Sequence, residues 1–173
     1  MITLAVLGLA GTTIARRPDG EALPPTPVRG AAETFAELRR RGVKVAIITE
    51  LAHDRAETLL HELGWTVGDG ATRGAGTVDA LVCADEVAAG RPAPYLVHRA
   101  MERTGISDVR QVLVAGDTVA ALEAGRASGA RFVIGVLTGA ARREELAAGP
   151  HDAILANVTE LIALAVPAAP PRD

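Results

Sequence analysis

Short apolar runs alternate along the chain with segments whose apolar residues recur at helical spacing. The first run, residues 2–7, is almost continuously apolar, as expected for a strand buried on both faces of a sheet. Strands that alternate with helices form a mainly parallel sheet covered by helices on both faces. The pattern therefore predicts a three-layer α/β fold with a sheet of five or six strands. The expected strands are residues 2–7, 43–48, 78–83, 111–115 and 131–137.

The gap between the first two strands carries Val28, Phe35 and Leu38 at helical spacing, and Gly42 ends this segment. Glycine is favoured just beyond a helix because it adopts the left-handed conformation without a steric penalty. The same reasoning predicts a helix in each later gap between strands. These helices end near Gly64, Gly105 and Ser128, and a last one covers 158–165, where Asn157 and Glu160 are spaced as in a capping box.

The length of 173 residues suits one domain with a substantial core. We expect this domain to cover residues 1–166 and the Pro- and Ala-rich segment 167–173 to be a flexible tail. Apolar residues make up 49% of the chain and aromatic residues only 2%, so the core must be built from Ala, Val, Leu and Ile.

The charge pattern argues against a nucleic-acid or membrane partner. The formal net charge is −3, no long basic run occurs, and the densest arginine group, around 39–41, is typical of a solvated helix face. Residues 1–9 are apolar but lack the basic start of a signal peptide, so they are interpreted as a strand and the protein is expected to be cytoplasmic. Cys83 is the single cysteine, which excludes an intrachain disulfide.

In open parallel sheets, ligands bind beyond the carboxyl ends of the strands. In this chain those ends are Gly8, Thr49, residues 83–85 and residues 116–118. A functional site is therefore expected to gather these residues.

Three motifs in the same order resemble the phosphonatase-like branch of the haloacid dehalogenase superfamily. They are AGTT at 10–13, after the first strand, AGRPAPY at 89–95, and GDT at 116–118. The resemblance runs along nearly the whole chain and implies a three-layer Rossmann-like core. It also implies hydrolysis of a phosphoester or phosphonate, with Mg²⁺ as the cofactor and a covalent aspartyl intermediate.

Several anion-holding parts of that machinery are present. The resemblance implies that Thr49 and Arg91 hold anionic oxygens and that the turn at Gly11 and Thr12 presents backbone N–H groups. Asp117 matches one member of the acidic pair that helps to hold the metal. The candidate site is thus Thr12, Thr49 and Arg91 for an anion, with Asp117 as the remaining metal ligand.

Two departures remove the family's chemistry. Gly8 stands at the position of the attacking aspartate, and Ala121 stands at the second acidic position of the last motif. Neither side chain can attack phosphorus or bind a cation, whereas Mg²⁺ wants hard oxygen ligands in octahedral geometry. No catalytic residue is therefore expected by the family mechanism, and magnesium binding is doubtful.

The cap is the third departure. Only about fifteen residues, 13–27, separate the first motif from the next helix, which is too short for a helical cap domain. Phosphonatases use a cap lysine to form a Schiff base, and this segment contains no lysine. Hydrolysis of phosphonoacetaldehyde by the family mechanism is therefore not expected.

Other candidates each have a structural explanation. Glu50 or Asp85 could replace the lost carboxylates, but each is also placed to face solvent or to begin a helix. Cys83 closes an apolar strand and is interpreted as a small core residue, and Arg91 either keeps an anion pocket open or contacts Asp117. The four histidines, His53, His61, His98 and His151, do not form a metal-spaced cluster.

Three functions follow from these observations. The first is a noncatalytic protein that binds a protein partner or a second copy of itself, with a phosphate-like anion as a further candidate ligand. The second is a hydrolase that uses Glu50 or Asp85 as a replacement carboxylate. The third is an enzyme of another reaction class that uses Arg91 and Asp117. The joint loss at Gly8 and Ala121 favours the first.

Overall fold

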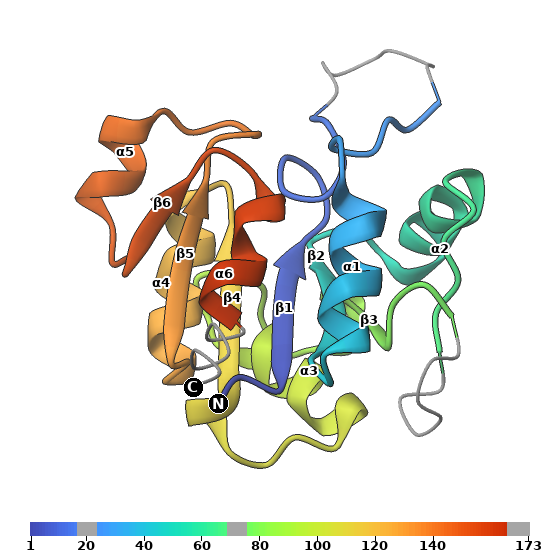
Figure 1. Cartoon of the computed structure of the whole chain (residues 1–173), viewed down its shortest axis with the longest axis horizontal. Helices are drawn as coiled ribbons and strands as arrows, with labels where there is room; N and C mark the ends of the chain where they lie inside the picture. The colour runs from blue at the N-terminus through green and yellow to red at the C-terminus, as the bar shows by residue number, and fades with distance from the viewer. Residues whose placement is uncertain (17–23, 69–75, 166–173) are drawn as a thin grey trace, which may run out of the picture.

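The computed structural model describes residues 1–16, 24–68 and 76–165 and contains one sheet in which every strand pair is parallel (Figure 1). Its six strands are ordered β3-β2-β1-β4-β5-β6. Their bounds are β1 Leu4–Gly8, β2 Lys44–Thr49, β3 Ala80–Cys83, β4 Val112–Gly116, β5 Phe132–Val136 and β6 Ala153–Leu155. The five strands expected from the apolar runs are therefore confirmed, in a sheet of the expected type.

Helices cover both faces of this sheet. Their bounds are α1 Ala31–Arg40, α2 His53–Glu62, α3 Tyr95–Thr104, α4 Val119–Ser128, α5 Arg143–Ala148 and α6 Leu161–Ala165, with short 3₁₀ turns η1 Ala84–Glu86, η2 Val109–Gln111 and η3 Val158–Glu160. Among the helices described, none has the length and hydropathy needed to cross a bilayer.

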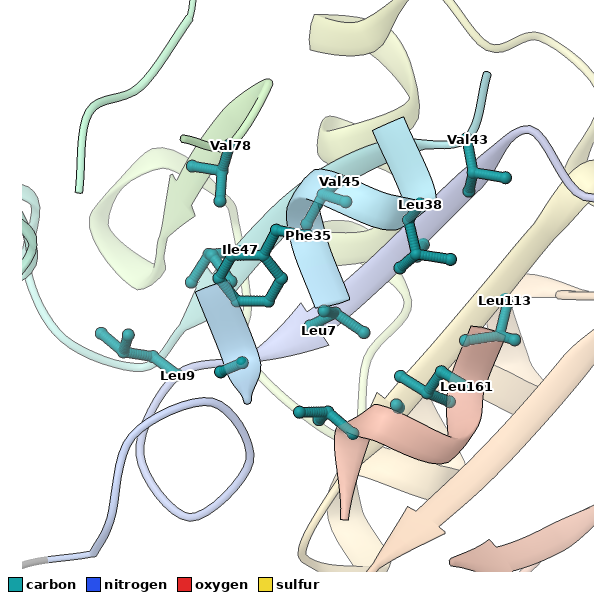
Figure 2. Packing of buried hydrophobic residues seen from close by; sticks show 14 of the residues in the cluster. Leu7, Leu9, Phe35, Leu38, Val43, Val45, Ile47, Val78, Leu113 and Leu161 are labelled. Atoms are coloured by element: carbon teal, nitrogen blue, oxygen red, sulfur yellow. The ribbon is translucent and has the colours of Figure 1, made fainter. Parts of the chain in front are cut away.

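The core divides into two clusters because strand side chains alternate between the faces of the sheet. Ala5 and Leu7 of β1 pack on the α1 side, while Leu4 and Val6 pack on the side of α3 and α4. Figure 2 shows Phe35 of α1 over Leu7 and the other apolar side chains of the first cluster. This two-sided burial explains why the strands are continuously apolar, and it confirms the three layers.

Two elements were not predicted from the sequence. The strand β6 has only three residues, all half-buried at the edge of the sheet, and the helix α5 has six, so neither gives a clear periodic pattern. The end of the chain also differs from the expectation. Residues 158–160 form the 3₁₀ turn η3 before α6 begins, and the Glu160 carboxylate accepts from the N–H of Ala156 instead of closing a capping box on Asn157.

The connection from β1 to α1 contains no helix in its described parts, residues 9–16 and 24–30. This agrees with the expected lack of a developed cap. The expected tail, 167–173, lies outside the described residues. The sheet order changes direction at β1 and β4, which come from distant parts of the chain and lie side by side. The carboxyl ends of these two strands, at Gly8 and Gly116, therefore flank the point where open α/β sheets bind ligands.

Candidate functional site

The loop after β1 is closed on itself by backbone hydrogen bonds. The carbonyl of Leu9 accepts from the N–H groups of Thr12, Thr13 and Ile14 at 3.3, 3.0 and 3.1 Å. The N–H of Gly11 donates to the Ile14 carbonyl at 2.8 Å. The two N–H groups expected to face an anion, those of Gly11 and Thr12, are thus engaged within the loop.

Gly8, the last residue of β1, faces the side chain of Thr12. A Cβ atom at position 8 would lie 2.8 Å from the Thr12 hydroxyl oxygen and 3.3 Å from Thr12 Cβ. This distance is too short unless the Thr12 side chain moves, which it can do by rotating its hydroxyl away about χ1. The space next to Gly8 is therefore partly filled by Thr12.

Asp117, directly after β4, is 2% exposed. Its Oδ1 accepts from the Thr12 hydroxyl at 3.2 Å and its Oδ2 accepts from the N–H of Ala140 at 3.0 Å. A Cβ atom at Gly11 or at Gly139 would lie 2.1 or 2.0 Å from Oδ2, so the carboxylate fits only because both residues are glycine. Asp117 therefore joins the loops that follow β1, β4 and β5.

Ala121 lies in the first turn of α4 and is buried. Thr118 caps this helix, its hydroxyl accepting from the N–H of Ala121 at 3.2 Å. A Cβ atom at Gly116 would lie 2.4 Å from the Ala121 Cβ, so this methyl group packs against the end of β4. The position matched to the second acidic residue of the family is thus a packing contact.

These residues do not fit a magnesium site of the family type. Mg²⁺ takes near-octahedral oxygen ligands, with one or two carboxylates among them. Gly8 and Ala121 offer no side-chain oxygen, and both carboxylate oxygens of Asp117 already accept hydrogen bonds from protein donors. Among the three family positions, Asp117 alone would offer a cation a carboxylate, and it is held by Thr12 and Ala140.

Arg91 pairs with Glu50 and not with Asp117. Its Nε donates to Glu50 Oε1 at 3.0 Å, and its backbone N–H donates to the same oxygen at 2.9 Å. The Arg91 side chain is 13% exposed and that of Glu50 49%. Glu50 thus neutralises the charge that would attract an anion, and Gly90 allows its carboxylate to approach the loop closely.

Thr49 ends β2 and is buried, in agreement with its expected place at the edge of the sheet. Its hydroxyl oxygen accepts from the N–H of Leu51 at 3.2 Å. The hydroxyl therefore helps to shape the turn from β2 toward α2. The structure brings Thr12, Asp117 and Gly8 into one group, while Arg91 and Glu50 form a separate ion pair.

Asp85 binds the beginning of α2. Its two carboxylate oxygens accept from the backbone N–H of His53, the first residue of that helix, at 3.1 and 3.2 Å. The first N–H groups of a helix lack partners within it, and a carboxylate satisfies them and complements the helix dipole. Asp85 therefore acts as a cap supplied from another segment.

Cys83 is fully buried at the end of β3. Burial, followed by the negative charges of Glu86 and Asp85, raises the pKa of its thiol from 9.0 to about 12. Without a bound cation, a thiol in this environment stays protonated at neutral pH and is a weak nucleophile. This agrees with its interpretation as a core residue.

A second group of polar side chains was not anticipated from the sequence. His53, Cys83 and Glu86 each place one potential ligand atom within 4.8 Å of the other two. The spacing of Cys83 and Glu86 was a detectable signal, because ligands three residues apart in a turn often share a metal. The approach of His53 depends on the pairing of β2 with β3 and has no signal in the linear sequence.

Comparison with known proteins finds a hydrolase family and two curated hydrolases that are similar to this chain. The sequence model of the haloacid dehalogenase-like hydrolases matches residues 8–129. The phosphonoacetaldehyde hydrolase of Parabacteroides distasonis is 36% identical over 114 residues, which are 66% of this chain and 40% of that protein. The enzyme of the same name from Bacillus cereus is 31% identical over the same shares. The chain thus spans about 40% of the length of these curated relatives.

Solved structures share the fold. A hydrolase from Pseudomonas syringae superposes with a TM-score of 0.76 at 19% identity, covering 94% of this chain and 97% of that one. The D,D-heptose 1.7-bisphosphate phosphatase from B. bronchiseptica, complexed with magnesium and phosphate, has a TM-score of 0.73 at 18% identity over the same shares. The likeness covers nearly the whole of both chains.

Proposed function

Because the chain belongs to the haloacid dehalogenase-like hydrolase family, we propose that it is a degenerate member that acts by binding and does not hydrolyse phosphoesters through an aspartyl intermediate. The observation that carries this proposal is that Gly8 lies beside the buried hydrogen bond between Thr12 and Asp117. Covalent phosphoryl transfer needs a nucleophile, and the described residues at the end of β1 supply no side chain that can attack.

The state of the anion-holding residues supports the same function. Electrostatic catalysis requires donors that are preorganised toward the developing charge. The Thr12 hydroxyl donates to Asp117, and Arg91 is neutralised by Glu50. A phosphate-like anion would have to compete with Glu50 for the guanidinium group.

The binding partner in this proposal is another protein or a second copy of the chain. A core without a developed cap leaves the carboxyl edge of the sheet available to a partner. Tyr95, the first residue of α3 and close in sequence to Arg91, is 46% exposed and offers an aromatic contact there. Aromatic side chains and arginine are enriched at protein interfaces. The proposal also takes residues 1–166 as one domain of a cytoplasmic protein.

A hydrolase with a replacement carboxylate is the second candidate. Glu50 is near the anion-holding Arg91, which favours it over Asp85, whose oxygens cap α2. In this function Glu50 would leave the guanidinium group and act on a substrate. An enzyme of another reaction class using Arg91 and Asp117 would need both residues to release their present partners.

The test is a phosphatase assay over a broad panel of phosphoesters with Mg²⁺, on the native chain and on the variant Gly8→Asp/Ala121→Asp. The proposal expects no magnesium-dependent turnover by the native chain, and activity in the restored variant once the Thr12 hydroxyl rotates away from the new side chain. Adding Asp117→Asn to the restored variant is the control, because it should abolish the regained activity.

Turnover by the native chain that EDTA abolishes would overturn the proposal. In that case Glu50→Gln and Asp85→Asn identify the replacement carboxylate, since only the one that acts should eliminate turnover. A small organic product formed without phosphate release would favour a different reaction class.

A further inference from the structure

A histidine, a cysteine and a glutamate converge where α2 begins and β3 ends. His53 is the first residue of α2, Cys83 is the last of β3, and Glu86 ends the turn η1. Their ligand atoms all lie within 4.8 Å of one another, and His53 Nδ1 is 3.6 Å from Glu86 Oε1. This group is separate from the residues around Asp117.

The backbone holds the three side chains in place. The Glu86 carboxylate accepts from the N–H of Cys83 at 2.6 Å, which closes the turn that joins them. Asp85, inside that turn, accepts from the N–H of His53 at 3.1 Å and ties α2 to η1. Parallel pairing of Thr49 with Cys83 aligns the ends of β2 and β3. The geometry is therefore set by hydrogen bonds that do not require a ligand.

The Nδ1 atom of His53 is buried and has no hydrogen-bond partner among the described residues. A buried nitrogen without a partner is uncommon and calls for an explanation such as a bound ion. The other ring nitrogen, Nε2, lies 3.6 Å from Oε1 of Glu57, one turn further along α2. Each ring nitrogen of His53 thus has a carboxylate oxygen at 3.6 Å, which is beyond hydrogen-bond distance, so Nδ1 is available to a cation.

We propose that His53, Cys83 and Glu86 bind a thiophilic divalent cation of the Zn²⁺ class through Nδ1, Sγ and a carboxylate oxygen. Zinc takes these three ligand types at about 2.0–2.3 Å, so ligand atoms around a tetrahedral ion lie roughly 3.5 Å apart. The three atoms need to close by about 1.3 Å at most to reach this geometry. A water molecule would complete the tetrahedron.

The surrounding charge also favours a cation. Glu57, Asp85 and Glu86 contribute three carboxylates, whereas Arg103, whose Nη2 is 2.6 Å from Glu86 Oε1, contributes one positive charge. The His53 side chain is 39% exposed, so a cation would enter beside it, while Cys83 lies on the buried side. The competing arrangement is a protonated His53 held between Glu57 and Glu86 without any metal.

The experiment titrates Zn²⁺ into the chelator-treated, tag-free chain by calorimetry and records the absorption spectrum of the Co²⁺ form. The expected result is one tight site per chain and a thiolate-to-cobalt charge-transfer band in the near ultraviolet. His53→Ala should weaken Zn²⁺ binding at least about tenfold. The matched control is His61→Ala, an exposed histidine of the same helix, which should bind as the native chain does.

The inference is overturned if the native chain and His53→Ala bind Zn²⁺ with equal affinity. It is also overturned if the cobalt form of the native chain has no thiolate band. The substitution Cys83→Ser should remove that band, but it changes a buried residue and can impair folding. Should it fail to fold, Glu86→Gln joins His53→Ala as the deciding variant. Zn²⁺ should also raise the thermal midpoint of the native chain and leave that of His53→Ala unchanged.

Discussion

The hydroxyl of Thr12 donates a hydrogen bond to the carboxylate of Asp117 across 3.2 Å, and both residues are buried. This contact connects the loop after β1 with the loop after β4 at the point where the family places its chemistry. In a working hydrolase of this type, an acidic residue here helps to hold a cation. In this chain the same carboxylate is a structural link between loops.

Replacing Asp117 by Asn distinguishes a structural role from a catalytic one. The new amide cannot accept from both the Thr12 hydroxyl and the Ala140 N–H, so one buried donor loses its partner. We expect the free energy of unfolding to fall by about 1–3 kcal/mol in urea denaturation. When a residue serves function at a cost in stability, its replacement raises the free energy of unfolding. An increase in stability for Asp117→Asn would thus contradict the structural role.

The glycines around Asp117 give a second prediction. Gly11→Ala and Gly139→Ala would each place a methyl group about 2 Å from the carboxylate, so each should lower the free energy of unfolding by more than about 2 kcal/mol. Gly64→Ala is the control for Gly11→Ala, because Gly64 shares the positive φ of Gly11 but has no atom within 4 Å of the new methyl group. It should cost only about 1 kcal/mol.

The clash itself can be isolated by a double-mutant cycle. In an Asp117→Ala background, Gly11→Ala should cost no more than Gly64→Ala, since the atoms it would meet are gone. An unchanged cost in that background would show that the backbone conformation of Gly11, and not the carboxylate, limits the position.

Glu50→Gln tests whether Glu50 suppresses anion binding by Arg91. The Glu50 side chain is half exposed, so losing the ion pair should change the free energy of unfolding by no more than about 1 kcal/mol. The freed guanidinium should bind inorganic phosphate severalfold more tightly in an isothermal titration. Glu62→Gln, at the exposed end of α2, removes the same charge elsewhere and should leave phosphate binding unchanged. Equal affinity for phosphate in the two variants would show that Glu50 does not suppress anion binding by Arg91.

The buried thiol of Cys83 predicts a loss of stability at alkaline pH. Its pKa is raised to about 12 in the folded chain, against 9.0 for an ordinary thiol. Above pH 9 the unfolded thiol ionises while the folded one keeps its proton, so the unfolded state binds fewer protons. The stabilising contribution is therefore complete below pH 9 and is lost as the pH rises toward 12, by up to about 1.4 kcal/mol per pH unit.

Urea denaturation of the native chain and of Cys83→Ala, in a chelator and between pH 8 and about pH 10.5, measures this loss. All other titratable groups are common to both proteins, so the difference between the two curves isolates Cys83. Parallel curves would show that the thiol ionises as readily in the folded chain as in the unfolded one.

Most of the fold followed from the linear pattern, because strands buried on both faces must be continuously apolar. β6 and α5 escaped detection since three and six residues are too few to establish a period. The motif positions of Gly8, Thr12 and Asp117 were also accessible from the sequence. Their hydrogen bonds were not, because Asp117 meets Thr12 only after β1 and β4 have paired.

The ion pair of Arg91 with Glu50 shows the same limit. The sequence left open whether Arg91 faced an anion pocket or Asp117, and its partner comes from a loop 41 residues earlier. The convergence of His53 on Cys83 depends in turn on the alignment of β2 with β3. Contacts between strand ends are set by sheet order, which local periodicity does not encode.

The sheet order also has a consequence during synthesis of the chain. β1 is made first but lies in the middle of the sheet, where Leu4 pairs with both Lys44 and Val112. Until β4 leaves the ribosome, one edge of β1 stays open and apolar, a state that invites aggregation. Closing that edge depends on the pairs that run from Leu4 to Leu7, whereas the reactive groups of this fold lie at the carboxyl ends of the strands. A nucleophile can therefore be lost at Gly8 without loss of the fold.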